Sequence, residues 1–228
     1  MVMDTLSKIY ESAHANLIAG DSYLLFLSGI KITLIITLAG LFSGTFLGAV
    51  LCAMQYSGSK ILTYISQTYI VVIRGTPILL LLMLLFYVVF AQTRMDAIYI
   101  AVIAFGLNSA AHIAEIMRSA LASVDPGQIM AARTLGFTKL GAFWHITLPQ
   151  ASEYARPVYQ NTVINVIQWT SVVGYITIAD LTRVINNTGA RTADPFFAIF
   201  IGIIIYLLMA YATYLIFQFA GRKKRAAR

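Results

Sequence analysis

The sequence predicts an all-α membrane protein that crosses the bilayer several times. Of its 228 residues, 59% are hydrophobic and only 11% are charged, and its mean hydropathy is +0.79. A soluble domain is about half apolar and about a quarter charged, so a soluble fold of this chain would have too little charge for its surface. The apolar residues also gather in five long segments, which favours five transmembrane helices.

Each segment is long enough, or nearly so, to cross the membrane, because a helix needs about 20 apolar residues to span the hydrocarbon core. The first segment is long enough to tilt, with Lys31 able to extend to the interface, and the fourth is the least apolar. Together they form a single membrane domain over 23–220. The segments are 24–54, 66–91, 97–120, 152–175 and 196–219.

The flanking regions are short and polar. Residues 1–22 lack the apolar centre of a signal peptide and form an extracytoplasmic N-terminal segment. No small-residue cleavage site follows the first apolar segment, so we expect that segment to be retained. Residues 221–228 form a basic tail. The single cysteine, Cys52, lies in an apolar run and has no second cysteine to pair with.

Lysines and arginines orient the chain, because they are enriched in cytoplasmic loops. With the N-terminus outside, eleven of them face the cytoplasm and five face outward. The +7 net charge is therefore interpreted as a sign of membrane topology. The C-terminal tail is then cytoplasmic, where anionic lipids attract it. The cytoplasmic set is Lys60, Arg74, Arg118, Arg133, Lys139, Arg156, Arg222, Lys223, Lys224, Arg225 and Arg228, and the outer set is Lys8, Lys31, Arg94, Arg183 and Arg191.

Two loops are predicted to contain short helices. The outer loop 176–195 carries ADLTRVI, which has helical spacing. In the cytoplasmic loop 125–149 one helix covers 128–135 and ends at Gly136, and Thr138 caps the next, which Pro149 ends. Leu140, Phe143 and Trp144 form its apolar face. The residues alone leave two interpretations open: a helix pair resting on lipid, or a docking surface for a cytoplasmic partner.

Polar side chains inside the third and fourth segments are candidates for a transport pathway, since such groups are costly in a membrane. They recur at helical spacing, so each set lies on one face: Asn108, His112, Glu115 and Ser119, and Asn161, Asn165 and Gln168. The alternatives are hydrogen bonds between helices, an Arg118 ion pair for Glu115, and a structural histidine. Gly75 and Pro77 predict a break in the second segment, either static or a hinge.

The stretch GQIMAARTLGFTKLGAFWHITLPQA (127–151) resembles the EAA loop of the membrane subunits of ABC importers. Six residues match that pattern in order and spacing: Ala131, Ala132, Gly136, Ile146, Leu148 and Pro149. Met130 departs from it, because the family usually has glutamate there. The resemblance implies that this loop is the coupling loop, with Ala131, Ala132, Gly136, Phe137 and Leu140 touching an ATPase subunit.

Three further stretches are similar to permeases for polar amino acids: VVIRGTPILLLLMLLFY (71–87), NSAAHIAEIMRSALASVDPGQ (108–128) and TSVVGYITIADLTR (170–183). His112 replaces the usual tyrosine, and Gln168 and Trp169 replace a usual Lys-Asp pair. The resemblance implies the MetI-like permease fold in a bacterial inner membrane. It also adds Thr170 and Ser171 to the substrate path.

The resemblance further implies the partners. They are a dimer of ATPase subunits that holds ATP and Mg, a second permease subunit and an extracytoplasmic amino-acid-binding protein. The chain itself has no phosphate-binding glycine-lysine motif, no metal-ligand spacing and no catalytic set, so we expect no cofactor, no enzymatic activity and no nucleic acid. The alternative function is an ion-coupled transporter or a channel subunit; the former would typically show more spans and an inverted repeat.

Overall fold

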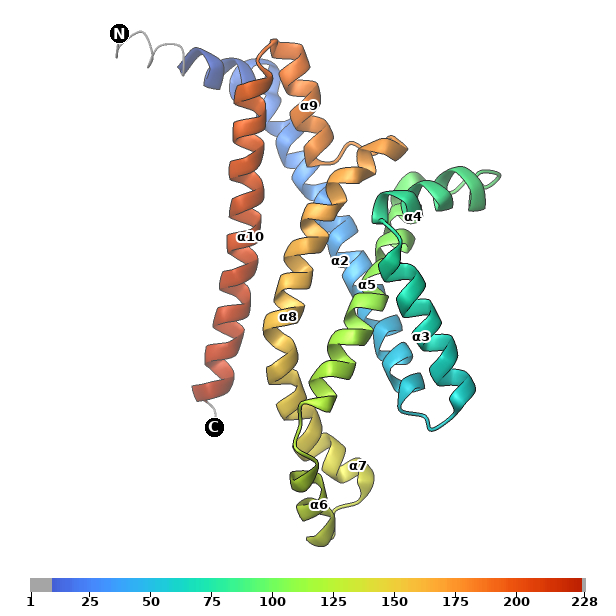
Figure 1. Ribbon diagram of the computed structural model, residues 1–228. Helices are drawn as coiled ribbons and strands as arrows, with labels where there is room; N and C mark the ends of the chain where they lie inside the picture. The colour runs from blue at the N-terminus through green and yellow to red at the C-terminus, as the bar shows by residue number, and fades with distance from the viewer. Residues whose placement is uncertain (1–9, 227–228) are drawn as a thin grey trace.

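Every regular element in the described part of the chain, residues 10–226 of a computed structural model, is helical (Figure 1). Short π or 3-10 turns precede α2 and join several helices. The longer helices are α2 (Ser22–Gln55), α3 (Lys60–Gly75), α4 (Ile78–Leu84), α5 (Ala97–Ala122), α6 (Pro126–Thr134), α7 (Lys139–Ala142), α8 (Leu148–Trp169), α9 (Leu181–Thr192) and α10 (Pro195–Ala226). The first nine residues of the predicted N-terminal segment and the last two of the basic tail lie outside the described residues.

Three helices are long and apolar enough to cross a membrane by themselves: α2, α5 and the part of α10 over Pro195–Gly221. Two bent pairs bring the number to as many as five if each pair counts as one span. They are α3 with the segment Ile78–Val89, and Lys139–Ile176 with α9. The all-α prediction is confirmed, and the predicted first, third and fifth segments coincide with single helices.

Helices α2 and α5 share the most extensive contact of the described fold, because glycines let their backbones approach. A Cβ at Gly44 would lie 2.6 Å from the Cβ of Ser109, and one at Gly48 would lie 3.0 Å from the carbonyl oxygen of Ala110. Small residues at a helix interface are the usual means of close packing in membranes. Phe105 is buried beside this contact, and α5 thus lies at the centre of the bundle.

The predicted second segment, 66–91, is divided between two helices. The first helix begins earlier, at Lys60, ends at Gly75, and the chain turns by 104° before α4. Thr76 is extended, since a residue before proline is pushed out of the helical region, and Pro77 then precedes α4. The break predicted at Pro77 is confirmed, and Figure 1 shows α4 directed away from the axis of α3.

The prediction that Pro149 ends a helix is wrong. The chain stays helical from Lys139 to Ile176, because the turn Phe143–Thr147 is π-helical and its bonds span five residues. The backbone N–H of Leu148 donates to the carbonyl of Phe143. This wider turn accommodates the proline ring, which would otherwise clash with a carbonyl of the preceding turn.

The helix predicted in the loop 176–195 is confirmed as α9. The Asp180 side chain caps it by accepting hydrogen bonds from the backbone N–H groups of Thr182 and Arg183, each at 3.1 Å. Helix α9 packs against α2, where a Cβ at Gly29 would lie 2.9 Å from the Cα of Leu181. It lies beside the N-terminal ends of α2 and α10, at the end of the molecule opposite α6 and α7 (Figure 1).

Candidate functional site

The loop 125–149 contains the two predicted short helices, α6 and α7. Asp125 caps α6 by accepting from the N–H of Gly127 at 2.8 Å, and Thr138 caps α7 by accepting from the N–H of Gly141 at 3.0 Å. Gly136 has a φ of +89°, a conformation that a side chain disfavours. The Arg133 guanidinium donates to the carbonyl of Phe137 at 2.9 Å and braces the turn.

This helix pair projects from one end of the molecule (Figure 1), and it exposes large apolar side chains. Leu135 is 80% exposed, Leu140 71% and Met130 64%. Four of the five predicted docking residues are exposed (Ala131, Gly136, Phe137 and Leu140), and Ala132 is buried.

The pair is firmly joined to the membrane helices. Helix α7 continues through the π turn into α8 without a break. The Gln150 side-chain amide of α8 donates to the side-chain oxygen of Gln128 in α6 at 2.5 Å. A displacement of the pair would therefore move α8 with it.

A polar cavity of about 450 Å³ opens farther along α5 and α8. Helix α5 contributes His112, Glu115 and Ser119, and α8 contributes Tyr154. Arg74 reaches it from the end of α3. The structure thus places three of the four residues of the predicted polar face of α5 in one cavity, and it adds Arg74, which helical spacing did not place in the pathway.

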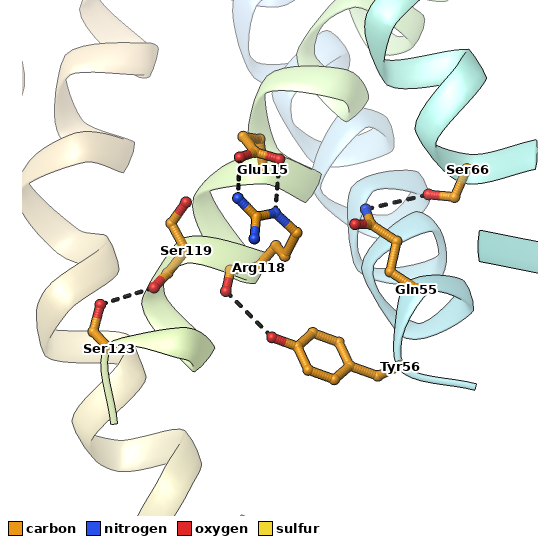
Figure 2. A network of polar contacts seen from close by, with 7 residues as sticks. All are labelled: Gln55, Tyr56, Ser66, Glu115, Arg118, Ser119 and Ser123. Atoms are coloured by element: carbon orange, nitrogen blue, oxygen red, sulfur yellow. Dashed lines mark hydrogen bonds and ion pairs between the residues drawn. The ribbon is translucent and has the colours of Figure 1, made fainter. Parts of the chain in front are cut away.

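Glu115 is paired within its own helix, as Figure 2 shows. Arg118 donates to both carboxylate oxygens, from Nη2 to Oε1 at 2.5 Å and from Nε to Oε2 at 3.0 Å. The ion pair that the sequence left as an alternative is therefore formed. The Glu115 side chain is still 30% exposed, so the carboxylate is available to the cavity.

Hydrogen bonds tie this helix end to α2. The hydroxyl of Tyr56, just beyond α2, donates to the carbonyl of Arg118 at 3.4 Å (Figure 2). Partial desolvation raises the pKa of the Tyr56 phenol above its ordinary value. Gln55 donates to the hydroxyl of Ser66 at 3.3 Å, which joins α2 to α3.

The other predicted path residues are not gathered in this cavity. Asn108 is buried, and its Oδ1 has no hydrogen-bond partner in the described part of the chain. Thr170 is buried and donates to the carbonyl of Ile167, and Ser171 is half-buried. Three residues lie on an exposed stripe of α8: Asn161, Asn165 and Gln168.

Helical periodicity in the sequence could not reveal two of the residues that the structure places beside the polar face of α5. Arg74 is distant in sequence from α5, and Trp169 packs its ring 5.2 Å from that of His112. Both depend on how helices cross. Within residues 10–226, no group of three or more His, Cys, Asp or Glu side chains could hold a metal ion.

A polytopic helical bundle with a projecting helix pair and a polar cavity defines a membrane transport subunit. The family described as binding-protein-dependent transport system inner membrane component matches residues 40–226. The chain belongs to this family, which confirms the resemblance seen in its motifs. The family description and the several apolar helices indicate a multi-pass protein of the inner membrane.

Individual relatives agree with this assignment. The chain is 34% identical over 178 residues to the probable amino-acid ABC transporter permease protein YckA of Bacillus subtilis, covering 78% of this chain and 79% of that protein. It is 30% identical over 208 residues to the histidine/lysine/arginine/ornithine transport system permease protein HisM of Salmonella typhimurium, with 86% and 88% covered.

The fold also matches solved structures. A crystal structure of an amino acid ABC transporter with histidines gives a TM-score of 0.80 at 33% identity, covering 88% of this chain and 94% of that one. An inward-facing MetNI methionine ABC transporter gives 0.71 at 20% identity, covering 88% and 98%, which shows a shared fold.

Proposed function

We propose that this chain is the permease subunit of an ABC importer that moves polar amino acids across the inner membrane. The observation that carries the proposal is the α6–α7 pair, which exposes apolar side chains and continues directly into the membrane helix α8. Such a rigid connection can convert the motion of an ATPase into motion of the spans. The amino acid transporters among its relatives support the substrate class.

In the proposed topology α3 with Ile78–Val89 forms one span and α8 forms another, which together with α2, α5 and α10 gives five. The N-terminus is outside and the C-terminus in the cytoplasm, following the distribution of lysine and arginine. The end of α10 and the α6–α7 pair lie toward the same end of the molecule (Figure 1), in keeping with a shared cytoplasmic side. Helix α9 is then extracytoplasmic, where an amino-acid-binding protein would deliver substrate.

A second permease subunit would cover the amide stripe of α8. Asn161, Asn165 and Gln168 are exposed on a helix at membrane depth, and amides are costly against lipid. Facing a second permease across a central pathway would give them polar neighbours. The substrate path would then run between this stripe and the cavity at Glu115, whose carboxylate suits the ammonium group of an amino acid.

ATP and Mg would bind to a dimer of ATPase subunits, with Met130 and Leu135 of α6 against one of them. Met130 stands where the family usually has glutamate, and its exposure of 64% is consistent with an apolar contact at that position. In this proposal ATP binding closes the ATPase dimer, and α6–α7 pass the motion to α8.

Transport by the reconstituted complex tests the function. We expect uptake of a polar amino acid into proteoliposomes to require the ATPase subunit and ATP. Uptake driven by an ion gradient without the ATPase would contradict the proposal and favour the alternative, an ion-coupled transporter or a channel subunit.

The coupling role is tested by Gly136→Val, with Gly58→Val as the matched control. Both glycines have a positive φ, +89° and +77°, and neither has an atom near an added Cβ. Each substitution should cost about 1–2 kcal/mol of backbone strain. Gly136→Val should abolish ATPase co-purification or uncouple ATP hydrolysis from uptake, whereas Gly58→Val should do neither. Equal behaviour of the two variants would exclude a special role for the loop.

A further inference from the structure

A large cleft lies between the α6–α7 pair and the adjoining ends of α2, α5, α8 and α10. Its volume is about 1060 Å³, against about 450 Å³ for the polar cavity. The lining is mostly apolar and comes from all these helices, including Ala53, Ile116, Leu121, Phe143, Trp144 and Phe217. The proposed function does not use this space.

A cleft of this size and character needs an occupant. Protein interiors contain few voids larger than a water molecule, and apolar cavities hold water poorly. The volume reaches the upper end of the range for sites that hold drug-sized ligands, about 300–1,000 Å³. In a bilayer, the apolar group available to fill such a cleft is the acyl chain of a lipid.

Two cations line the same cleft, Lys139 from α7 and Arg156 from α8. Neither makes an ion pair within 4.0 Å with a carboxylate of the described residues. Gly221 of α10 makes room for the Arg156 guanidinium, because an added Cβ there would collide with Nη1. Arginine binds phosphate through paired hydrogen bonds and lysine binds it as a point charge.

We propose that this cleft binds one anionic phospholipid, with its acyl chains along the apolar lining and its phosphate at Lys139 and Arg156. The inference rests on the proposed orientation, which puts the cleft at the inner leaflet, where anionic lipids are attracted by basic segments. Five further cations follow in the sequence after Gly221, in keeping with an anionic surface there. The bound lipid would fill the space between the coupling pair and the spans.

Trp144 provides a direct probe because it lines the cleft. The sequence has one other tryptophan, Trp169, which packs on His112 and can be changed to phenylalanine. In that background the purified full chain is placed in bilayers containing either phosphatidylglycerol or phosphatidylcholine with brominated acyl chains, at equal mole fraction. We expect stronger quenching of Trp144 by brominated phosphatidylglycerol.

Charge variants distinguish a specific phospholipid site in the cleft from general attraction of anionic lipid to a basic protein surface. Lys139→Gln and Arg156→Gln should each lower the preference for phosphatidylglycerol about fivefold. Lys60→Gln is the matched control, since it removes one cation of the predicted cytoplasmic set without touching the cleft, and it should retain the preference. Ala53→Phe, which fills part of the cleft from an exposed position of α2 without adding a tryptophan, should reduce quenching, whereas Val50→Phe outside the cleft should not.

Equal quenching by the two lipids would overturn the proposal, since ordinary boundary lipid would account for it. Absence of quenching by either lipid would overturn it too, because the cleft would then be closed by protein. If Lys60→Gln lowered the preference for phosphatidylglycerol as much as Lys139→Gln and Arg156→Gln, net charge alone would explain the preference, and this would overturn the proposal. None of these results bears on ATP-driven uptake, which is measured separately, so failure of the lipid site and failure of the transporter assignment are distinguishable.

Discussion

Helices α5 and α10 are both apolar enough to cross a membrane, yet their surroundings differ sharply. In its most apolar stretch α5 is 61% buried inside the chain, whereas α10 is only 11% buried. The difference lies in side-chain size and polarity. Helix α5 carries small residues against α2 and a polar face toward a cavity, and α10 exposes large apolar side chains such as Phe200 and Leu208. Hydropathy predicts a span, and small residues indicate which span is central.

The largest effect is expected where α2 meets α5. In Gly44→Ala the added methyl would meet backbone atoms of α5 at 3.0 and 3.1 Å as well as the Cβ of Ser109, so the helices must separate. We expect a loss of about 1–3 kcal/mol in the free energy of unfolding, measured as a lower Tm of the purified chain in detergent.

Gly202→Ala on α10 is the control for that substitution. The three atoms nearest its added methyl all belong to the Ile185 side chain, the closest being the terminal Cδ1. A side chain can shift at lower cost than a helix backbone, so the expected loss is smaller than for Gly44→Ala, about 1 kcal/mol. Equal Tm values for the two variants would show that the α2–α5 contact is no more demanding than the edge of the bundle.

A second effect is expected on transport rather than stability. Glu115→Gln removes the charge that faces the cavity, and hydrogen bonds to charged groups are worth about 1.5–3 kcal/mol, so uptake should fall about tenfold or more. The partly exposed pair with Arg118 contributes about 0–1 kcal/mol to stability, so the Tm should change little. Gln218→Leu on α10 should leave uptake unchanged, and native uptake by Glu115→Gln would assign Glu115 a structural role.

The smallest effect on stability is expected at the end of α3. Gly75 has no atom within 4 Å of an added Cβ, so Gly75→Ala should change the free energy of unfolding by less than about 0.5 kcal/mol. If Gly75 and Pro77 form a hinge, uptake by Gly75→Ala should still be slower than native. Native uptake together with native stability would show that the 104° bend is static.

Much of the fold followed from composition and spacing. The apolar segments predicted α2, α5 and α10 because length and hydropathy alone decide whether a helix suits a bilayer. Gly136 and Thr138 predicted the boundary between α6 and α7, since caps and positive φ angles are local. Pro77 predicted a break, but its 104° angle depends on what α4 packs against, and the π turn that carries Pro149 inside a helix has no simple sequence signal.

The candidate site likewise has features that the sequence predicted and features that depend on the tertiary structure. The sequence by itself determined that His112, Glu115 and Ser119 share one face, because a helix repeats every 3.6 residues. Only the tertiary structure decided that Arg74 joins them, that the α8 amides stay outside the cavity, and that Lys139 and Arg156 line one cleft. Those neighbours arise from the crossing of α2, α5 and α8, and such crossings are set by packing between residues far apart in the chain.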